Sequence, residues 1–177
     1  MSNLNPKPQG REEKVQEQKL PEGESQGSEK QELTEWKPYE LDYRAQKIVL
    51  QYRDQKDVLN ESHKMRMTVA YGLERFWGEH LRLKKDNKTK QKSAYWESVW
   101  QELGKILELA DINKLPRKSI DPDNTTQIDE TVKAIWNMNL DERRVALMIL
   151  TQFCDSLVWW TQRYKKKNDN DQGESNS

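Results

Sequence analysis

The sequence predicts an all-α protein, a helical bundle of about five helices with a long central helix near the C-terminus. Two observations support this fold class. Apolar residues recur at the spacing of one helix face over most of the chain, and neither alternating strand patterns nor hairpin turns are found. Loop-forming residues gather at 111–126, which hold two prolines and the run Asp-Pro-Asp-Asn-Thr-Thr.

The composition divides the chain into three parts. Hydrophobic residues make up 33% and charged residues 34% of the 177, against about 45–50% and about 25% in average globular chains. Residues 1–40 hold six basic and nine acidic residues and few apolar ones. This composition predicts a disordered acidic arm over 1–38, and 168–177 are expected to form a disordered tail. The helical bundle domain is therefore expected over 39–167.

Three helices are expected in the first half of this domain. The first covers 41–52, where apolar residues follow one helix face. The second is expected to start from a cap at Ser62 and to continue to Leu83. The third is expected to start from a cap at Ser93 and to present one apolar side as far as Leu107.

Two more helices follow the proline-containing loop. A short fourth helix carries an apolar stripe over 128–136. The fifth is expected to extend from a cap at Asp141 to about Lys166. It is apolar on more than one side, which is typical of a helix that packs on several neighbours.

Positive charge between Arg75 and Lys92 is the strongest polar feature. This segment contains seven basic residues and two acidic ones. Its part at 84–92 contains no apolar residue, which predicts a basic loop between two helices. Cations in a loop gain nothing from a helix dipole, so contact with a phosphate backbone is favoured there. The cations at 163–167 are better explained by the end of the last helix. The candidate RNA-binding residues are Arg75, Arg82, Lys84, Lys85, Lys88, Lys90 and Lys92.

The chain contains 7 tryptophans, and most of them fall on apolar stripes that predict core packing. Trp159 and Trp160 are adjacent and project about 100° apart on a helix, so one of them is expected to cover an exposed patch. Because tryptophan is enriched at interface hot spots, Trp36, Trp159 and Trp160 are candidate protein-interaction residues, and self-association is one such interaction. Stacking on single-stranded bases is an alternative role for these rings.

Patterns for catalysis or metal binding do not rise above background. His63 and His80 lie about 25 Å apart along the predicted helix and cannot share a metal. Cys154 lies within an apolar stripe, which predicts a buried structural thiol. The run that starts at Asp121 lacks the glycine and glutamate of a calcium loop. We therefore expect a protein that is not an enzyme, with no catalytic residue, no metal and no cofactor.

A cytoplasmic location without a membrane span is also expected. The single cysteine fits a reducing compartment, and the first residues have no apolar core of the kind that secretory signals carry. The longest apolar run, at 145–160, is shorter than the about 20 residues that span a bilayer and contains Asp155.

Four segments follow one another in the helical domain. Arg-Ala-Gln-Lys-Ile stands at 44–48, and Ala-Tyr-Gly-Leu-Glu-Arg-Phe-Trp stands at 70–77. After the basic turn come an aromatic-rich helix at 95–107 and a closing helix at 146–164, in which Leu, Trp and basic residues alternate. This order resembles the small all-helical subunit of type III CRISPR–Cas effector complexes, nearer the Cmr branch than the Csm branch. The family commonly has Asn where Tyr71 stands, and the long acidic arm is not part of its pattern.

The resemblance implies a non-catalytic, RNA-contacting structural subunit of a multisubunit ribonucleoprotein that serves antiviral defence. Copies of such a subunit would stack along the complex beside other protein subunits, and their basic faces would bind the backbone of guide and target RNA. The alternative is a helical protein-binding adaptor or assembly factor with a disordered acidic arm. That alternative depends on Trp36, Trp159 and Trp160.

Overall fold

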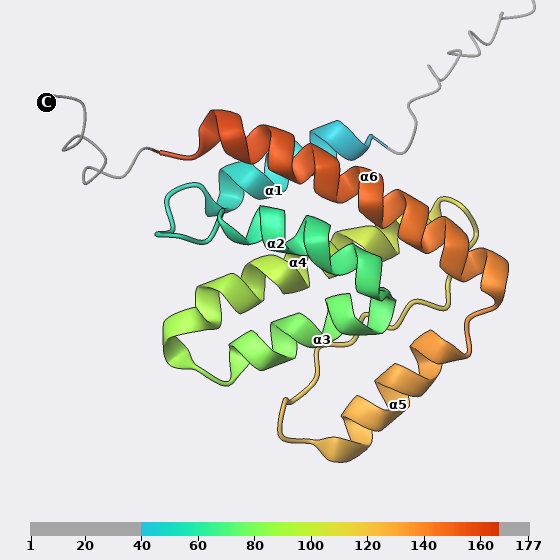
Figure 1. The fold of residues 1–177 in the computed structure, drawn as a ribbon. Helices are drawn as coiled ribbons and strands as arrows, with labels where there is room; N and C mark the ends of the chain where they lie inside the picture. The colour runs from blue at the N-terminus through green and yellow to red at the C-terminus, as the bar shows by residue number, and fades with distance from the viewer. Residues whose placement is uncertain (1–39, 167–177) are drawn as a thin grey trace, which may run out of the picture. The chain divides into compact units, whose positions relative to one another are not determined.

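The computed structural model describes residues 40–166 of the chain and contains six α-helices in this part, with no strand (Figure 1). The all-α prediction is confirmed. The predictions made for the acidic arm at 1–38, for Trp36 and for the tail at 168–177 lie outside the described residues. The helices are α1 (Leu41–Tyr52), α2 (Glu61–Thr68), α3 (Leu73–Lys84), α4 (Lys90–Glu108), α5 (Thr125–Trp136) and α6 (Leu140–Tyr164), with short 3-10 helices η1 (Val69–Tyr71) and η2 (Asn87–Thr89).

The single helix expected from Ser62 to Leu83 is divided into two helices, α2 and α3, because the helical conformation is interrupted at Gly72. This glycine has a φ of 102°, a backbone conformation that side chains with a Cβ rarely adopt. A Cβ at this position would also lie 3.0 Å from the carboxylate oxygens of Glu74. The break separates α2, which packs on α6, from α3, which packs on α4.

The three helix caps expected from the sequence are wrong. Ser62 and Ser93 lie buried inside α2 and α4, and the Ser93 hydroxyl donates to the carbonyl oxygen of His80 at 2.7 Å. The helix α6 starts after Asn139, whose side chain accepts from the backbone N–H of Glu142 at 2.7 Å. The Glu142 carboxylate accepts in return from the Asn139 N–H at 3.2 Å, which completes a capping box.

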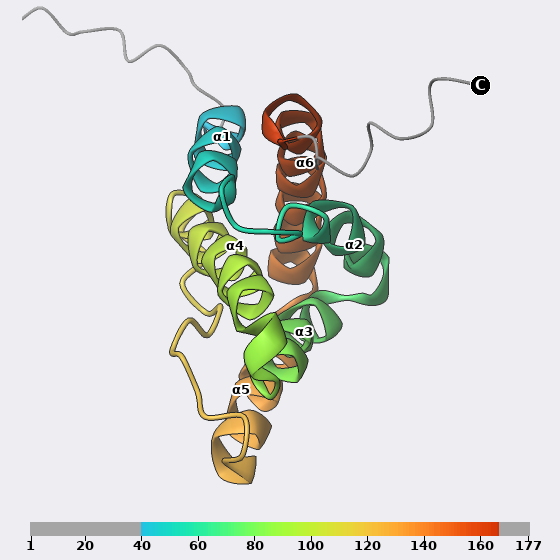
Figure 2. The ribbon, with the colours of Figure 1, turned by 90° about the vertical axis from the view of Figure 1, so that its left-hand side faces the viewer.

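Helices α1 and α6 run in the same sense and end near one another (Figures 1 and 2). The Ser156 hydroxyl donates to the Asp42 carboxylate at 2.7 Å, near the start of α1. At its other end, Arg53 Nε donates to the carbonyl oxygen of Tyr164, the last residue of α6, at 3.1 Å. The turn that connects α3 and α4 lies on the same side of the bundle as these two helix ends, at the left in Figure 1.

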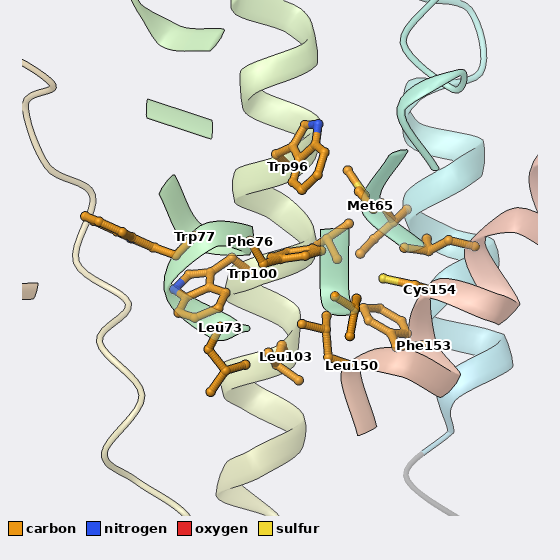
Figure 3. Close-up of a cluster of buried hydrophobic side chains, with 14 of the residues drawn as sticks. Met65, Leu73, Phe76, Trp77, Trp96, Trp100, Leu103, Leu150, Phe153 and Cys154 are labelled. Carbon is orange, nitrogen blue, oxygen red and sulfur yellow. The ribbon is translucent and has the colours of Figure 1, made fainter. Parts of the chain in front are cut away.

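The core is filled by aromatic and aliphatic side chains from α1, α2, α3, α4 and α6, and Figure 3 shows the part of it between α2, α3, α4 and α6. The Phe76 ring centre lies 4.9 Å from that of Trp96 and 6.2 Å from that of Trp100. Cys154 is fully buried beside Phe153, and burial raises the pKa of its thiol. The prediction that this thiol is buried is therefore confirmed, and so is core packing for the tryptophans at 77, 96 and 100.

Helices α4 and α6 share the centre of the bundle. Of the 25 residues of α6, seven are buried, and they face α1, α2 and α4, as expected for a helix that is apolar on more than one side. The short α5 packs mainly on α3 and buries only Ile135 fully. Within the described part of the chain, no helix is both long enough and apolar enough to cross a bilayer.

Candidate nucleic-acid interface

A buried polar junction joins four helices at the end of the bundle where α1 and α6 finish. The Ser62 hydroxyl lies 2.7 Å from the Tyr95 hydroxyl and 2.8 Å from the Thr161 hydroxyl. The Tyr52 hydroxyl donates to the carbonyl oxygen of Ala94 at 3.0 Å. Burial raises the pKa of Tyr95, so its hydroxyl stays protonated. These bonds connect distant parts of the chain and fix which surface residues gather at this end.

Glu61, the first residue of α2, is fully buried beside this junction. Its carboxylate accepts from Trp96 Nε1 at 3.1 Å and from Lys64 Nζ at 2.8 Å, and Lys92 Nζ lies 3.6 Å away. A buried carboxylate requires such partners, because removing it from water penalises its charge. Glu61 therefore brings one lysine of α2 and one of α4 to the same place at the surface.

The basic segment between α3 and α4 is a tight turn and is shorter than the loop expected over 84–92. The Asp86 side chain accepts from the backbone N–H of Lys88 at 2.9 Å, and the Thr89 hydroxyl donates to the carbonyl oxygen of Leu83 at 2.6 Å. Because α4 already begins at Lys90, the lysines at 90 and 92 belong to the first turn of a helix.

Three of the candidate RNA-binding residues already have partners within the protein. Arg82 Nε donates to the Glu79 carboxylate at 2.9 Å, and this hydrogen bond raises the pKa of Arg82. Lys84 Nζ donates to the carbonyl oxygen of Ile120 at 3.1 Å. Lys92 shares the Glu61 carboxylate. These three side chains are less free to meet a ligand than the sequence suggests.

The other four candidates point to solvent. Lys85, Lys88 and Lys90 are exposed around the α3–α4 turn, and none of them forms an ion pair with any residue from 40 to 166. Arg75 is also exposed, on α3, with its guanidinium 5.5 Å from the centre of the Tyr71 ring. The basic turn, defined here as Lys85, Lys88 and Lys90, is therefore the most available cationic group of the predicted set.

The structure adds basic residues that the sequence does not single out. Lys64 lies at this end of the bundle because it forms an ion pair with Glu61. Arg53 and Lys56 lie in the loop between α1 and α2, close to the end of α6. In the sequence, aspartates alternate with these two residues at 53–57, so the local net charge is small and gives no signal. Lys166, assigned from sequence to the end of the last helix, forms an ion pair with Asp54 that lowers the pKa of this aspartate.

Trp159 and Trp160 lie on α6, and the structure places them beside cations. The two ring centres are 4.5 Å apart and nearly perpendicular, and Trp159 remains 46% exposed while Trp160 is half-buried. The Arg163 guanidinium lies 3.2 Å from the centre of the Trp159 ring. An open pocket of about 310 Å³ is lined by Asp42, Asp155, Ser156, Trp159 and Trp160.

The exposed lysines are the chemical groups at this end of the bundle that could contact an anion. Lysine ammonium groups neutralise phosphates without reading the sequence of a nucleic acid. Among residues 40–166, no three histidine, cysteine or acidic side chains approach closely enough to hold a metal ion. Comparison with protein-family models, with curated proteins and with solved structures found no match for this chain.

Proposed function

We propose that the protein is a non-catalytic, RNA-contacting structural subunit of a ribonucleoprotein, and that the basic turn contacts RNA phosphates. The observation that carries this proposal is the position of the lysines before and within the first turn of α4. Cations are disfavoured at a helix N-terminus by the helix dipole. The dipole of α3 favours Lys85, which is the C-cap of that helix. Helix stability does not account for Lys88 and Lys90, and an external polyanion does.

The surroundings of the basic turn support a preformed surface. The polar junction ties the start of α4 to the ends of α1 and α6, so little ordering is required when a strand binds. Lys64, Arg82 and Lys92 add positive potential nearby, although acidic partners reduce the contribution of each.

The test is a triple variant, Lys85→Gln, Lys88→Gln and Lys90→Gln, assayed for binding to single-stranded RNA at several salt concentrations. Each lost phosphate contact lowers the slope of log K against log salt by about 0.7 for single strands. The slope is therefore expected to fall by about 2.

A matched control removes three exposed lysines that form ion pairs elsewhere, through Lys105→Gln, Lys114→Gln and Lys133→Gln. Both variants lose the same formal charge, so a general charge effect would weaken binding equally in the two. Unchanged RNA binding in the basic-turn variant, or an equal loss in the control, would contradict the proposal.

A narrower proposal, that the ribonucleoprotein is a cytoplasmic type III CRISPR–Cas effector complex, depends on the sequence resemblance alone. It predicts that the protein, purified from its own cells, carries RNA transcribed from CRISPR repeats together with other subunits of the complex. Sequencing of the bound RNA tests this directly. Bound RNA of other origin would refute the narrower proposal and leave RNA contact standing.

A second candidate function is a protein-binding adaptor, and the exposure of Trp159 above the pocket on α6 favours it. Deleting 1–38 or making Trp159→Ala should then remove a specific protein partner, while the triple lysine variant should retain it. Loss of that partner only in the lysine variant would indicate that RNA bridges the two proteins and would exclude the adaptor function.

A further inference from the structure

A pocket of about 190 Å³ is lined by residues of the α1–α2 loop and of the end of α6. The α1–α2 loop lies on the same side of the bundle as the α3–α4 turn, at the left in Figure 1. Gln55 and Leu59 form its uncharged lining. The charged residues around it are Arg53, Lys56, Lys165, Lys166, Asp54 and Asp57. Two separate segments of the chain thus bring four cations and two carboxylates together.

The walls of this pocket are held in place by contacts between α1, the loop and α6. Arg53 Nε donates to the carbonyl oxygen of Tyr164 at 3.1 Å, and Gln46 Nε2 donates to the Tyr164 hydroxyl at 3.0 Å. Lys166 and Asp54 form an ion pair across the pocket. Arg53, Asp54 and Lys166 are therefore in place before any ligand arrives.

The charge left over in the pocket is positive. The Asp54 carboxylate is paired with Lys166, and Asp57 accepts from Asn60 Nδ2 at 3.2 Å. Lys56 and Lys165 are exposed and form no ion pair with the described residues. Two free ammonium groups beside the guanidinium of Arg53 suit an anion such as a phosphate diester.

Gln55 provides the second, independent feature. Its side-chain oxygen Oε1 is buried and has no hydrogen-bond donor anywhere in residues 40–166. A buried acceptor without a donor is costly, so a state in which the Gln55 side chain turns into the pocket that it lines and meets a donor is favoured. The phosphate diester of a nucleic acid has no donor to offer. The ribose 2′-hydroxyl of RNA is a donor on the backbone itself, and DNA lacks it.

We propose that this pocket holds one ribonucleotide of a bound strand, with its phosphate against Lys56 and Lys165. The Gln55 side chain turns into the pocket when the strand binds, and the 2′-hydroxyl donates to its Oε1. The inference rests on the proposed function in one respect, since it requires that the protein binds RNA. The two surfaces are linked through Tyr52, whose hydroxyl bonds to Ala94 of α4, while Arg53 follows it in the chain. In this arrangement Gln55 is the residue that distinguishes RNA from DNA.

The experiment compares the full chain and its variants on RNA, on DNA of the same sequence, and on that RNA with 2′-O-methyl groups. One hydrogen bond corresponds to about a two- to ten-fold difference in affinity, so the wild type should bind RNA more tightly than the other two strands by this factor. Gln55→Leu should lower RNA affinity to the level of DNA and leave DNA affinity unchanged. Lys56→Gln with Lys165→Gln should weaken both, with a salt slope smaller by about 1.4.

Each outcome separates this inference from the proposed function. Equal affinity of the wild type for RNA and DNA, or an unchanged ratio in Gln55→Leu, would overturn the ribonucleotide pocket even if the basic-turn variant loses binding. Loss of strand binding only in the Lys56 and Lys165 variant would refute the basic turn and keep the pocket. Gln55→Met, with a melting curve matched to the wild type, repeats the test if the leucine variant unfolds.

Discussion

The middle of the bundle and its basic end are held together by different forces. In the middle, apolar side chains such as Phe76, Trp100 and Phe153 are held by the hydrophobic effect, which has no preferred direction, and by the fit of their shapes. At the basic end, hydrogen bonds of Ser62 and Glu61 join particular atoms of three helices, α2, α4 and α6. The difference indicates that apolar packing provides most of the stability, while the polar contacts determine where the cations lie. Substitutions in the two regions should therefore have separable effects.

The largest effect on stability is expected from Phe153→Ala in the apolar middle. The side chain is fully buried, and truncating such a residue costs about 3–5 kcal/mol in the free energy of unfolding. Urea unfolding measures this loss, and RNA binding by the remaining folded protein should keep its salt slope. The exposed Met148→Ala on the same helix is the control and should change stability by less than about 0.5 kcal/mol. A changed slope in Phe153→Ala would show that the two regions are not separable.

The substitution Glu61→Gln is expected to lower stability by a smaller amount and to strengthen RNA binding. The amide keeps the shape of the side chain and an acceptor for Trp96, but it removes the charge that holds Lys64 and Lys92. Hydrogen bonds to charged groups contribute about 1.5–3 kcal/mol, and unfolding should become easier by about that amount. RNA should bind more tightly because two ammonium groups are released. Weaker RNA binding by a folded Glu61→Gln protein would contradict this role of the carboxylate.

The smallest expected effect is a dependence of the free energy of unfolding on pH, which comes from a histidine in the middle region. Burial lowers the pKa of His80 below its usual 6.5, so the unfolded chain binds a proton more readily than the folded one. The stabilising contribution is complete above about pH 6.5 and decreases as the pH falls through the lowered pKa. Urea unfolding at about pH 7.5 and about pH 5 measures the difference, and His80→Gln should reduce it. Greater stability of the wild type at the acidic pH, with no change in His80→Gln, would contradict the assignment.

The helices were predictable from the sequence because apolar spacing is a local property. The first helix and the short helix before the last one match α1 and α5 closely, and the long last helix matches α6. The break at Gly72 was not predicted, because the apolar spacing continues across it and only the glycine marks it. The caps failed because Ser62 and Ser93 make tertiary bonds that compete with capping.

The candidate interface was predictable only in part, because charge pairing depends on tertiary contacts. The exposure of the basic turn follows from a run without apolar residues. The partners of Lys84 and Lys92 could not be read from the sequence: Ile120 lies 36 positions from Lys84, and Glu61 is drawn to α4 by Trp96, 35 positions away. The pocket around Gln55 has no sequence signal, since its cations come from the two ends of the helical region.

The position of Cys154 gives the protein its own reporter of motion. The chain has a single thiol, which is fully buried in the middle of α6 and whose pKa is raised by that burial. A water-soluble thiol reagent can therefore react only with molecules in which α6 has separated from its neighbours. The labelling rate measures how often this happens, and a strand that binds the folded form alone should slow the reaction in proportion to its occupancy. No added dye or engineered residue is needed to follow the opening of the core.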